Sequence, residues 1–129
     1  MHKEGYYQNI EIDILKLRKY LSQKICSDKA LVLLLKADDM MIGFFVAEII
    51  EYFFSRERLA MDSLFFIIKK KRKSIGAIKL LKVYFEWVKL HNVKEITLSS
   101  TNGVEVEKIE KLYVKLGFKR VGIMYKKGV

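Results

Sequence analysis

Apolar residues recur at helical spacing in two segments of the chain. Over Ile10–Lys24 they stand among Lys, Arg and Gln, which is the pattern of a helix with one apolar face. A second segment runs from Ala77 to His91–Asn92 and carries Lys and Glu on the face opposite its apolar stripe. That stripe consists of Ile78, Leu81, Phe85 and Val88, widened by Leu80, Tyr84 and Trp87. The pattern predicts two amphipathic helices, each with a face to bury.

A third helical pattern follows the polar segment at residues 100–103. Its apolar stripe consists of Val106, Ile109, Leu112, Tyr113 and Leu116. Asn102, with Glu105 three residues later, matches the capping box that often begins a helix. Gly117 stands where a helix commonly ends in a left-handed residue. We therefore expect a helix between Asn102 and Gly117.

Runs of apolar and β-branched residues predict the strands of one sheet. The strands are expected at Ala30–Leu35, Met40–Ile50, Met61–Ile68, Glu95–Ser99 and Phe118–Lys126. A turn at residues 37–39 would join the first two as a hairpin. The strand–helix–strand unit over 64–99 requires two parallel strands and a right-handed crossover. The order of elements predicts an α/β fold with a central mixed β-sheet flanked by helices.

Length and composition favour one domain with a core of its own. We expect residues 1–129 to form a single domain, because 129 residues leave no room for a second. Hydrophobic residues make up 51% of the chain, which suffices for a core without disulfides or metal. Cys26 has no second cysteine to pair with, and His2 and His91 are the only histidines. We therefore expect no metal site.

The charge balance is basic, with 25 Lys and Arg against 15 Asp and Glu and a formal net charge of +10. Such a chain attracts phosphates, nucleic acid or acidic surfaces. The charge is spread along the sequence, so nucleic acid stays open as a partner but is not favoured. The most apolar stretch, Met40–Phe54, contains Glu48 and Glu51 and is too short to span a bilayer. The first ten residues do not resemble a signal peptide, so we expect a cytoplasmic protein without a membrane partner.

A basic loop joins the third predicted strand to the helix that follows it. Five consecutive cations occupy Lys69–Lys73, and the small residues Ser74, Gly76 and Ala77 come directly after them. The first turn of a helix has unpaired N–H groups and the positive end of the helix dipole, and together these bind phosphate. The same run is also what a solvated turn looks like. Both interpretations stay open on the residues alone.

The stretch from Leu64 to Lys126 resembles the core of the GNAT N-acetyltransferases. That family has an apolar strand, then Gln/Arg-x-x-Gly-x-Gly/Ala at the start of a long helix that often ends in an acidic residue followed by Trp. Here Arg72–Ala77 stands at the junction and Glu86–Trp87 near the helix end. Downstream, Tyr113–Phe118 matches the family's Tyr-x-x-x-Gly-Phe. The two motifs in this order, with a strand between them, carry the resemblance.

The resemblance implies a GNAT acyl-CoA N-acyltransferase fold and acetyl-CoA as co-substrate. It assigns coenzyme contacts to Phe65, Phe66, Ile67, Arg72, Lys73, Ser74, Ile75, Gly76 and Ala77. The strand edge at 65–67 would pair with the pantetheine arm, and an N–H there would polarise the thioester carbonyl. The backbone at 72–77 would hold the pyrophosphate. Tyr113 would protonate the leaving thiolate, although its position also suits a core aromatic.

Several details of the resemblance leave alternatives open. With Arg72 as anchor, Ile75 stands at the family's first glycine, where a β-branched residue resists positive φ. A second register, anchored by Lys71, keeps Gly76 but loses the arginine. The family's helix asparagine has its nearest counterpart in Asn102. The family's first strand is either reduced to Tyr6–Ile10 or absent, which leaves room for a homodimer.

The acceptor implied by the resemblance is a primary amine that attacks the thioester directly in a ternary complex. The amine must lose a proton, so a carboxylate is expected nearby. Asp62 is the candidate base, with Glu48 and Glu51 as alternatives. A second hypothesis is a catalytically weak, GNAT-like binding module that uses its basic surface on nucleic acid or a protein. A third is an interaction protein of unrelated fold.

Overall fold

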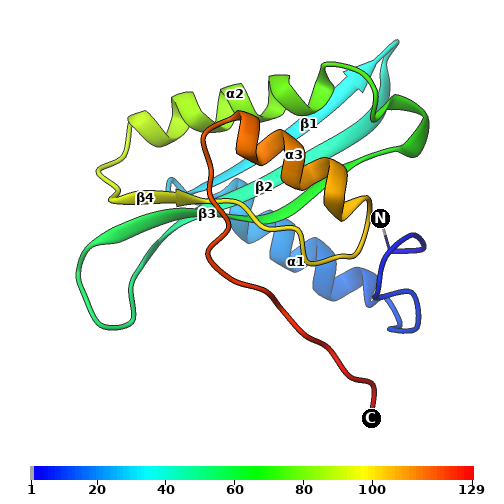
Figure 1. The fold of residues 1–129 in the computed structure, drawn as a ribbon, viewed down its shortest axis with the longest axis horizontal. Coiled ribbons are helices and arrows are strands. Elements are labelled where there is room, and N and C mark those ends of the chain that lie inside the picture. The colour runs from blue at the N-terminus through cyan, green and yellow to red at the C-terminus, as the bar shows by residue number, and fades with distance from the viewer. Residues whose placement is uncertain (1) are drawn as a thin grey trace. The chain divides into compact units, whose positions relative to one another are not determined.

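The computed structural model describes residues 2–129, which form two compact units. The first comprises residues 11–97, and the second comprises residues 2–10 and 98–129. The first unit contains α1 (Ile14–Ile25), β1 (Ala30–Ala37), β2 (Met40–Glu51), β3 (Arg58–Ile67), α2 (Gly76–Lys89) and β4 (Glu95–Thr97), and the second contains α3 (Val106–Lys115) (Figure 1). A short 3₁₀ turn, η1 (Lys69–Lys71), precedes α2. The single domain expected from the chain length stays a prediction.

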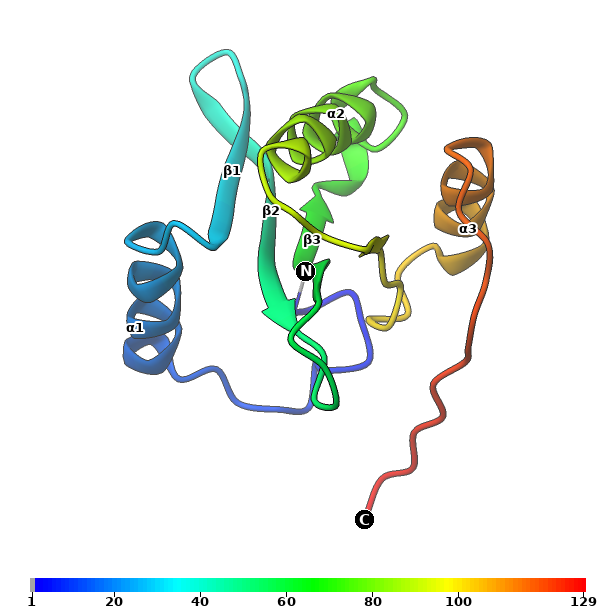
Figure 2. The same ribbon diagram turned by 90° about the vertical axis from the view of Figure 1, so that its left-hand side faces the viewer.

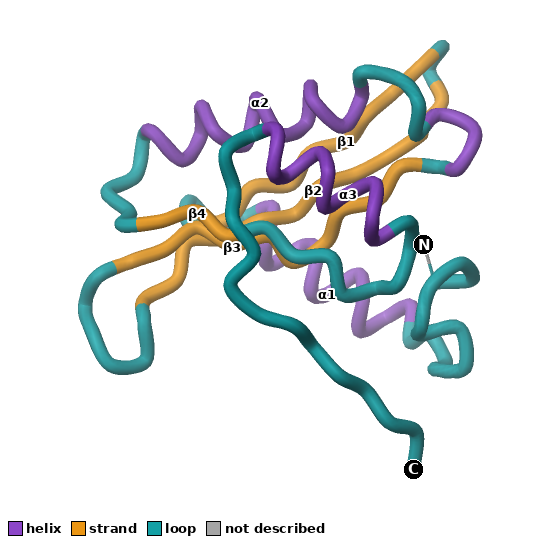
Figure 3. Tube along the Cα trace, in the orientation of Figure 1, coloured by secondary structure: helices purple, strands orange, loops and turns teal. Residues whose placement is uncertain are grey.

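The first unit is built on a mixed sheet with the strand order β1-β2-β3-β4 (Figure 3). β1, β2 and β3 are antiparallel neighbours, whereas β3 and β4 are parallel. β3, α2 and β4 therefore form the expected parallel unit. The predicted mixed sheet and its flanking helices are confirmed.

The β1–β2 hairpin closes through two residues in the left-handed region. Asp38 and Asp39 have φ values of 51° and 61°. Two consecutive positive φ values produce the turn twist that matches the twist of paired strands, and Asp tolerates this conformation better than most residues. The predicted turn is confirmed.

Helices α1 and α2 lie on opposite faces of this sheet (Figure 2). Phe45 of β2 is fully buried, and its ring lies 4.8 Å from that of Tyr84 on α2. Glu48, three residues on, points to the other face and pairs with Lys24 of α1. Side chains alternate between the two faces along a strand, so Phe45 and Ala47 belong to the α2 face and Glu48 to the α1 face.

Helix α1 begins later than its apolar pattern suggests. The Asp13 side chain accepts a 2.9 Å hydrogen bond from the Lys16 amide and caps the helix. A carboxylate in this place satisfies an amide that the helix itself leaves unpaired. The residues from Ile10 to Asp13 therefore precede the helix, although the apolar pattern includes them.

The capping box predicted for α3 is wrong, whereas its C-terminus is confirmed. The Asn102 side chain accepts from the Val104 amide at 3.0 Å, before the helix starts, and Glu105 adopts φ 46° without a side-chain cap. At the other end Gly117 has φ 90°. The Phe118 amide donates to the Tyr113 carbonyl at 3.0 Å, and the Gly117 amide donates to Val114. These two bonds form a Schellman motif.

One further strand prediction in the second unit is wrong, and of the two alternatives for the family's first strand, the structure agrees with its absence among residues 2–129. Phe118–Lys126 lies in a segment without regular secondary structure, and Tyr6–Ile10 forms turns. A strand needs a neighbour for its N–H and C=O groups, and neither segment has a paired strand within residues 2–129. The Lys126 ammonium instead donates to the Tyr6 carbonyl at 2.7 Å and lies 4.2 Å from the centre of the Tyr7 ring.

Candidate functional site

The edge of β3 that faces β4 is paired over only part of its length. β3 pairs with β2 from Arg58 to Ile67, but with β4 only from Leu59 to Met61. Beyond Met61 this edge has no strand neighbour in the described part of the chain. It includes the three residues predicted to meet the pantetheine arm, Phe65, Phe66 and Ile67. Free N–H and C=O groups on such an edge can accept an added extended ligand.

A β-bulge lies next to the point where the β4 pairing ends. Val46 of β2 faces Leu64, and the next residue, Ala47, faces Asp62, so Ser63 is the extra residue. A bulge bends its strand and increases the local twist. The bend therefore coincides with the place where β3 and β4 separate.

The connection from β3 to α2 is held by its own arginine. Arg72 Nε donates to the Ile67 carbonyl at 2.7 Å, and the guanidinium lies 5.2 Å from the centre of the Phe66 ring. Arg72 thus fastens the loop to the end of β3. The neighbouring cations Lys69, Lys70, Lys71 and Lys73 are exposed.

The first turn of α2 includes two amides without a partner among the described residues. The Ser74 hydroxyl donates to the Lys71 carbonyl at 2.6 Å and accepts a long bond from the Gly76 amide. The first amide of α2 that bonds to a main-chain carbonyl is that of Lys79, which donates to Ile75. Within residues 2–129 the N–H groups of Ala77 and Ile78 make no such bond. They are the amides with which a helix binds a phosphate.

Ile75 does not obstruct this turn in the way the sequence suggests. Its φ is −71°, so the site requires no left-handed residue there. Its side chain is 63% exposed and points away from the core.

Gly76 allows α2 to approach the sheet closely. A Cβ on Gly76 would lie 2.4 Å from Leu35 Cδ2 on β1. The absence of a side chain at Gly76 therefore serves helix–strand packing.

Asp62, the predicted base, is buried on the α2 face of the sheet. Its side chain is only 5% exposed, and it lies opposite Ala47 on the face that Tyr84 covers. Burial raises the pKa of the Tyr84 hydroxyl, and the negative charge of Asp62 raises that pKa further. The Tyr84 hydroxyl has no hydrogen-bond partner among the described residues. Two ionisable groups are thus enclosed together beneath α2.

Tyr113 and Asn102 both lie in the second unit. Tyr113 is buried on α3, and its hydroxyl donates to the Ser99 carbonyl at 3.0 Å. The Asn102 carbonyl accepts from the Tyr6 amide at 2.9 Å. Both of the Asn102 contacts described are therefore with its own unit.

A polar cluster that the sequence does not reveal lies beside the bulge. The Lys24 ammonium contacts one carboxylate oxygen of Glu48, and the Ser63 hydroxyl donates to the other at 3.2 Å. One feature of the sequence could have pointed to this cluster, namely the polar pair Asp62–Ser63 inside an otherwise apolar strand. Two adjacent polar residues break the two-residue alternation and indicate a bulge.

Metal-binding clusters and membrane-spanning helices are not found among the described residues. Among residues 2–129, no three His, Cys, Asp or Glu side chains gather closely enough to hold a metal ion. None of the helices found in that range has the length and apolar character needed to cross a membrane.

Comparisons with solved structures identify the fold. AAC(6')-Iy, in complex with the bisubstrate analogue CoA-S-monomethyl-acetylneamine, superimposes with a TM-score of 0.73 at 19% identity, over 100% of this chain and 88% of that one. A GNAT family acetyltransferase from Staphylococcus aureus gives 0.65 at 21% identity, over 98% and 85%. A transcriptional regulator from Bacillus halodurans gives 0.80 at 12% identity, over 99% and 87%. No protein-family model and no curated protein sequence matches the chain.

These similarities show that the chain has the GNAT acetyltransferase fold, as the two motifs implied.

Proposed function

We propose that the chain is an acetyl-CoA-dependent N-acetyltransferase that acts on a primary amine. The observation that carries this proposal is the edge of β3 that has no strand neighbour after Met61 in the described chain and leads to the open amides of Ala77 and Ile78. An extended amide-containing arm suits a free strand edge, and a diphosphate suits a helix N-terminus. Coenzyme A contains both in this order.

The residues present fit the coenzyme. Residues 72–77 would hold the pyrophosphate, with the amides of Ala77 and the following Ile78 as its donors, since those of Arg72 and Ser74 already bond within the loop. The lysines of that loop would add positive charge. Phe65–Ile67 would pair with the pantetheine arm through main-chain groups. Arg72 would keep the loop in place through its bond to Ile67. Asn102 stays a proposed coenzyme contact that rests on the family resemblance.

Acetyl-CoA supplies an activated acetyl group as a thioester. A main-chain N–H at the β3 edge would stabilise the negative charge that develops on the carbonyl oxygen. Asp62 would take the proton that the acceptor amine loses, and Tyr113 would give one to the departing sulfur. Holding both reactants together would supply much of the rate.

The structural neighbours support the coenzyme more than the acceptor. AAC(6')-Iy is in complex with the bisubstrate analogue CoA-S-monomethyl-acetylneamine, and two other neighbours are named as aminoglycoside acetyltransferases. The present chain carries a net charge of +10, which does not suit a polycationic acceptor such as an aminoglycoside. We therefore propose a primary amine on a neutral or acidic molecule. A homodimer and a cytoplasmic location stay predictions.

Titration with acetyl-CoA tests the proposal directly. A ligand that binds only the folded protein must raise the melting temperature as its concentration rises. We expect a saturable rise and, in calorimetry, one site per chain. Adenosine alone, without the diphosphate and pantetheine, is the control and should produce a much smaller shift. Absence of any shift at millimolar acetyl-CoA would refute the proposal.

A second candidate function is a binding module for nucleic acid. It is favoured by the exposed lysines at 69–71 and 73 and by the fold shared with a protein described as a transcriptional regulator. Salt separates the two functions, because counterion release makes nucleic-acid affinity fall steeply with ionic strength. Binding of duplex DNA in the absence of acetyl-CoA binding would favour this candidate.

A further inference from the structure

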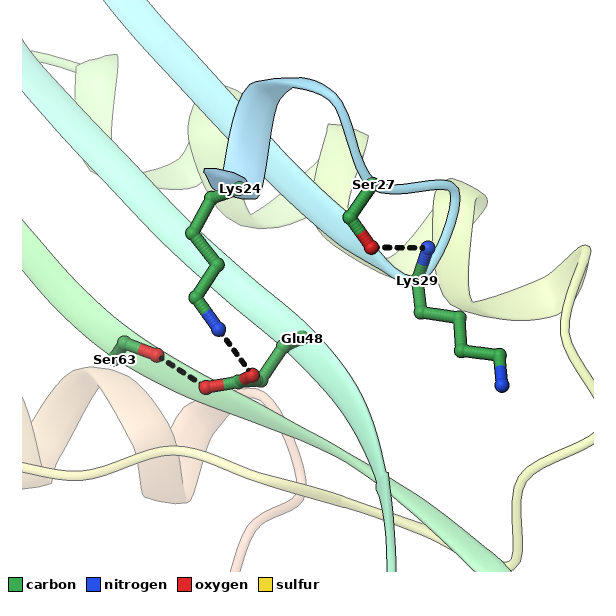
Figure 4. Close-up of polar contacts among 5 residues, drawn as sticks. All are labelled: Lys24, Ser27, Lys29, Glu48 and Ser63. Carbon is green, nitrogen blue, oxygen red and sulfur yellow. Dashed lines mark hydrogen bonds and ion pairs between the residues drawn. The ribbon is translucent and has the colours of Figure 1, made fainter. Parts of the chain in front are cut away.

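Lys24, Glu48 and Ser63 form a continuous polar chain from α1 across β2 to β3 (Figure 4). The Lys24 ammonium contacts Glu48 Oε2, and the Ser63 hydroxyl donates to Glu48 Oε1 at 3.2 Å. The three residues come from three elements of the first unit. Glu48 therefore links a primary amine to the bulge residue of β3.

The Lys24 amine is enclosed to a degree unusual for a lysine of this chain. Its side chain is 20% exposed and that of Glu48 27% exposed, whereas both partners of the Lys89–Glu86 pair are about 70% exposed. The ammonium also lies 5.3 Å from the centre of the Tyr20 ring. An aromatic face and a carboxylate together form a receptacle for a primary ammonium.

This receptacle adjoins the edge on which the pantetheine arm is proposed to lie, and the inference rests on that proposed function. A coenzyme with its pyrophosphate at α2 would run along the free edge from Ile67 toward Ser63. Four residue steps at strand spacing give about 13 Å of edge. The edge closes at Met61, where β4 pairs. The thioester end of the arm would therefore come to rest near the bulge.

We infer that Lys24 is a site of self-acetylation. Its amine is the chemical group that the proposed reaction consumes, and Glu48 is a carboxylate already in contact with it. The Lys24 ammonium gives one proton to Glu48, which passes it to water. The neutral amine then forms a C–N bond to the thioester carbonyl carbon as the C–S bond breaks. The second proton lost by the nitrogen goes to the departing sulfur, so the products are acetyl-Lys24, coenzyme A and one proton.

Acetylation has a structural consequence that needs no coenzyme to observe. It removes the positive charge of Lys24 and leaves the Glu48 carboxylate, which is three-quarters covered, without its cation. Lys24→Gln reproduces this change of charge. The variant and the acetylated protein should therefore melt at similar temperatures, both below that of the unmodified protein.

Site-resolved mass spectrometry tests the inference, with Lys29 as the matched lysine. Lys29 is exposed, lies five residues away, and its ammonium contacts none of the other residues drawn in Figure 4. Acetic anhydride, which reacts according to exposure, should label Lys29 more than Lys24. With acetyl-CoA the order should reverse, and Lys24 should be acetylated about tenfold faster than Lys29 or more, because the rate then depends on the position of the amine beside the thioester and not on its exposure. The fraction of Lys24 acetylated per unit time should not depend on protein concentration, since the transfer takes place within one molecule.

Two variants identify the role of Glu48. Glu48→Gln should reduce acetylation of Lys24 by acetyl-CoA at least tenfold, whereas Glu86→Gln, which breaks an exposed ion pair, should leave it unchanged. Circular dichroism confirms that each variant is folded. If acetyl-CoA binds in calorimetry but labels Lys24 no faster than Lys29, self-acetylation is wrong while the proposed function stands. If acetyl-CoA does not bind, both are wrong.

Discussion

The hydroxyl of Tyr113 donates a 3.0 Å hydrogen bond to the main-chain carbonyl of Ser99. This bond joins α3 to the segment that follows β4 and fixes the direction of the phenol. Tyr113→Phe removes the hydroxyl while keeping the ring. We expect the free energy of unfolding to fall by only about 0.5–1.5 kcal/mol, because Ser99 is exposed and its carbonyl can accept a hydrogen bond from water instead.

The same variant tests the general acid. If Tyr113 protonates the leaving sulfur, turnover should fall roughly a hundredfold while the dissociation constant of acetyl-CoA stays unchanged. Release of coenzyme A thiol measures the first quantity and calorimetry the second. Unchanged turnover would assign Tyr113 to packing alone.

Arg72 and Lys73 are adjacent cations with different surroundings. Arg72 bonds to Ile67 and lies over Phe66, whereas Lys73 is exposed. Arg72→Ala should lower stability by about 1–2 kcal/mol and weaken acetyl-CoA binding by loosening the loop. Lys73→Ala should change stability by less than about 0.5 kcal/mol. Denaturant unfolding and coenzyme titration of both variants check this, and equal effects would show that only charge matters.

Alanine substitutions at Gly117 and Gly122 distinguish the cost of backbone strain from the cost of a steric clash. A Cβ would meet nothing within 4 Å at either glycine, but Gly117 has φ 90° and Gly122 is not in the left-handed region. Gly117→Ala should therefore cost about 1–2 kcal/mol through backbone strain alone. Gly122→Ala should be close to neutral. Thermal denaturation of the two variants measures the difference.

Tyrosine ionisation should destabilise the protein at high pH. The pKa of Tyr52 rises from 10 to about 12, mainly because the Tyr52 hydroxyl is hydrogen-bonded to the Glu95 carboxylate. The folded state therefore keeps a proton that the unfolded state releases earlier. This contribution to stability is complete below pH 10 and is lost as the pH rises toward 12. Chemical denaturation between pH 8 and 11.5 should show the decline, and Tyr52→Phe should reduce it.

The sequence predicts most of the first unit because its signals are local. The apolar runs of β1, β2 and β3, the Asp38–Asp39 turn and the stripe of α2 each depend on near neighbours. Within that stripe Leu81 and Val88 are buried as expected, whereas Ile78 is exposed. β3 starts three residues earlier than expected, at Arg58, because pairing with Glu51 extends the ladder beyond the apolar run. Pairing is a tertiary property and leaves no mark on periodicity.

The second unit shows where local signals fail. Phe118–Lys126 has the composition of a strand, yet a strand exists only with a neighbour to pair with. Asn102 and Glu105 have the spacing of a capping box, but the Asn102 side chain bonds to Val104 instead. For the site, the motif located the loop and α2, whereas the contact between Lys24 and Glu48 joins residues 24 positions apart and has no local pattern.

Strand β3 contains one residue, Ser63, that has no partner opposite it on β2. Deletion of this residue should therefore be tolerated by the β2–β3 pairing. Loss of Ser63 would leave Asp62 opposite Ala47 and Leu64 opposite Val46, so every other partner along β2 would be preserved. The strand would, however, straighten, and we expect its ladder with β4 to continue past Met61. Deletion of this one residue would therefore close the edge of β3 on which the pantetheine arm is proposed to lie.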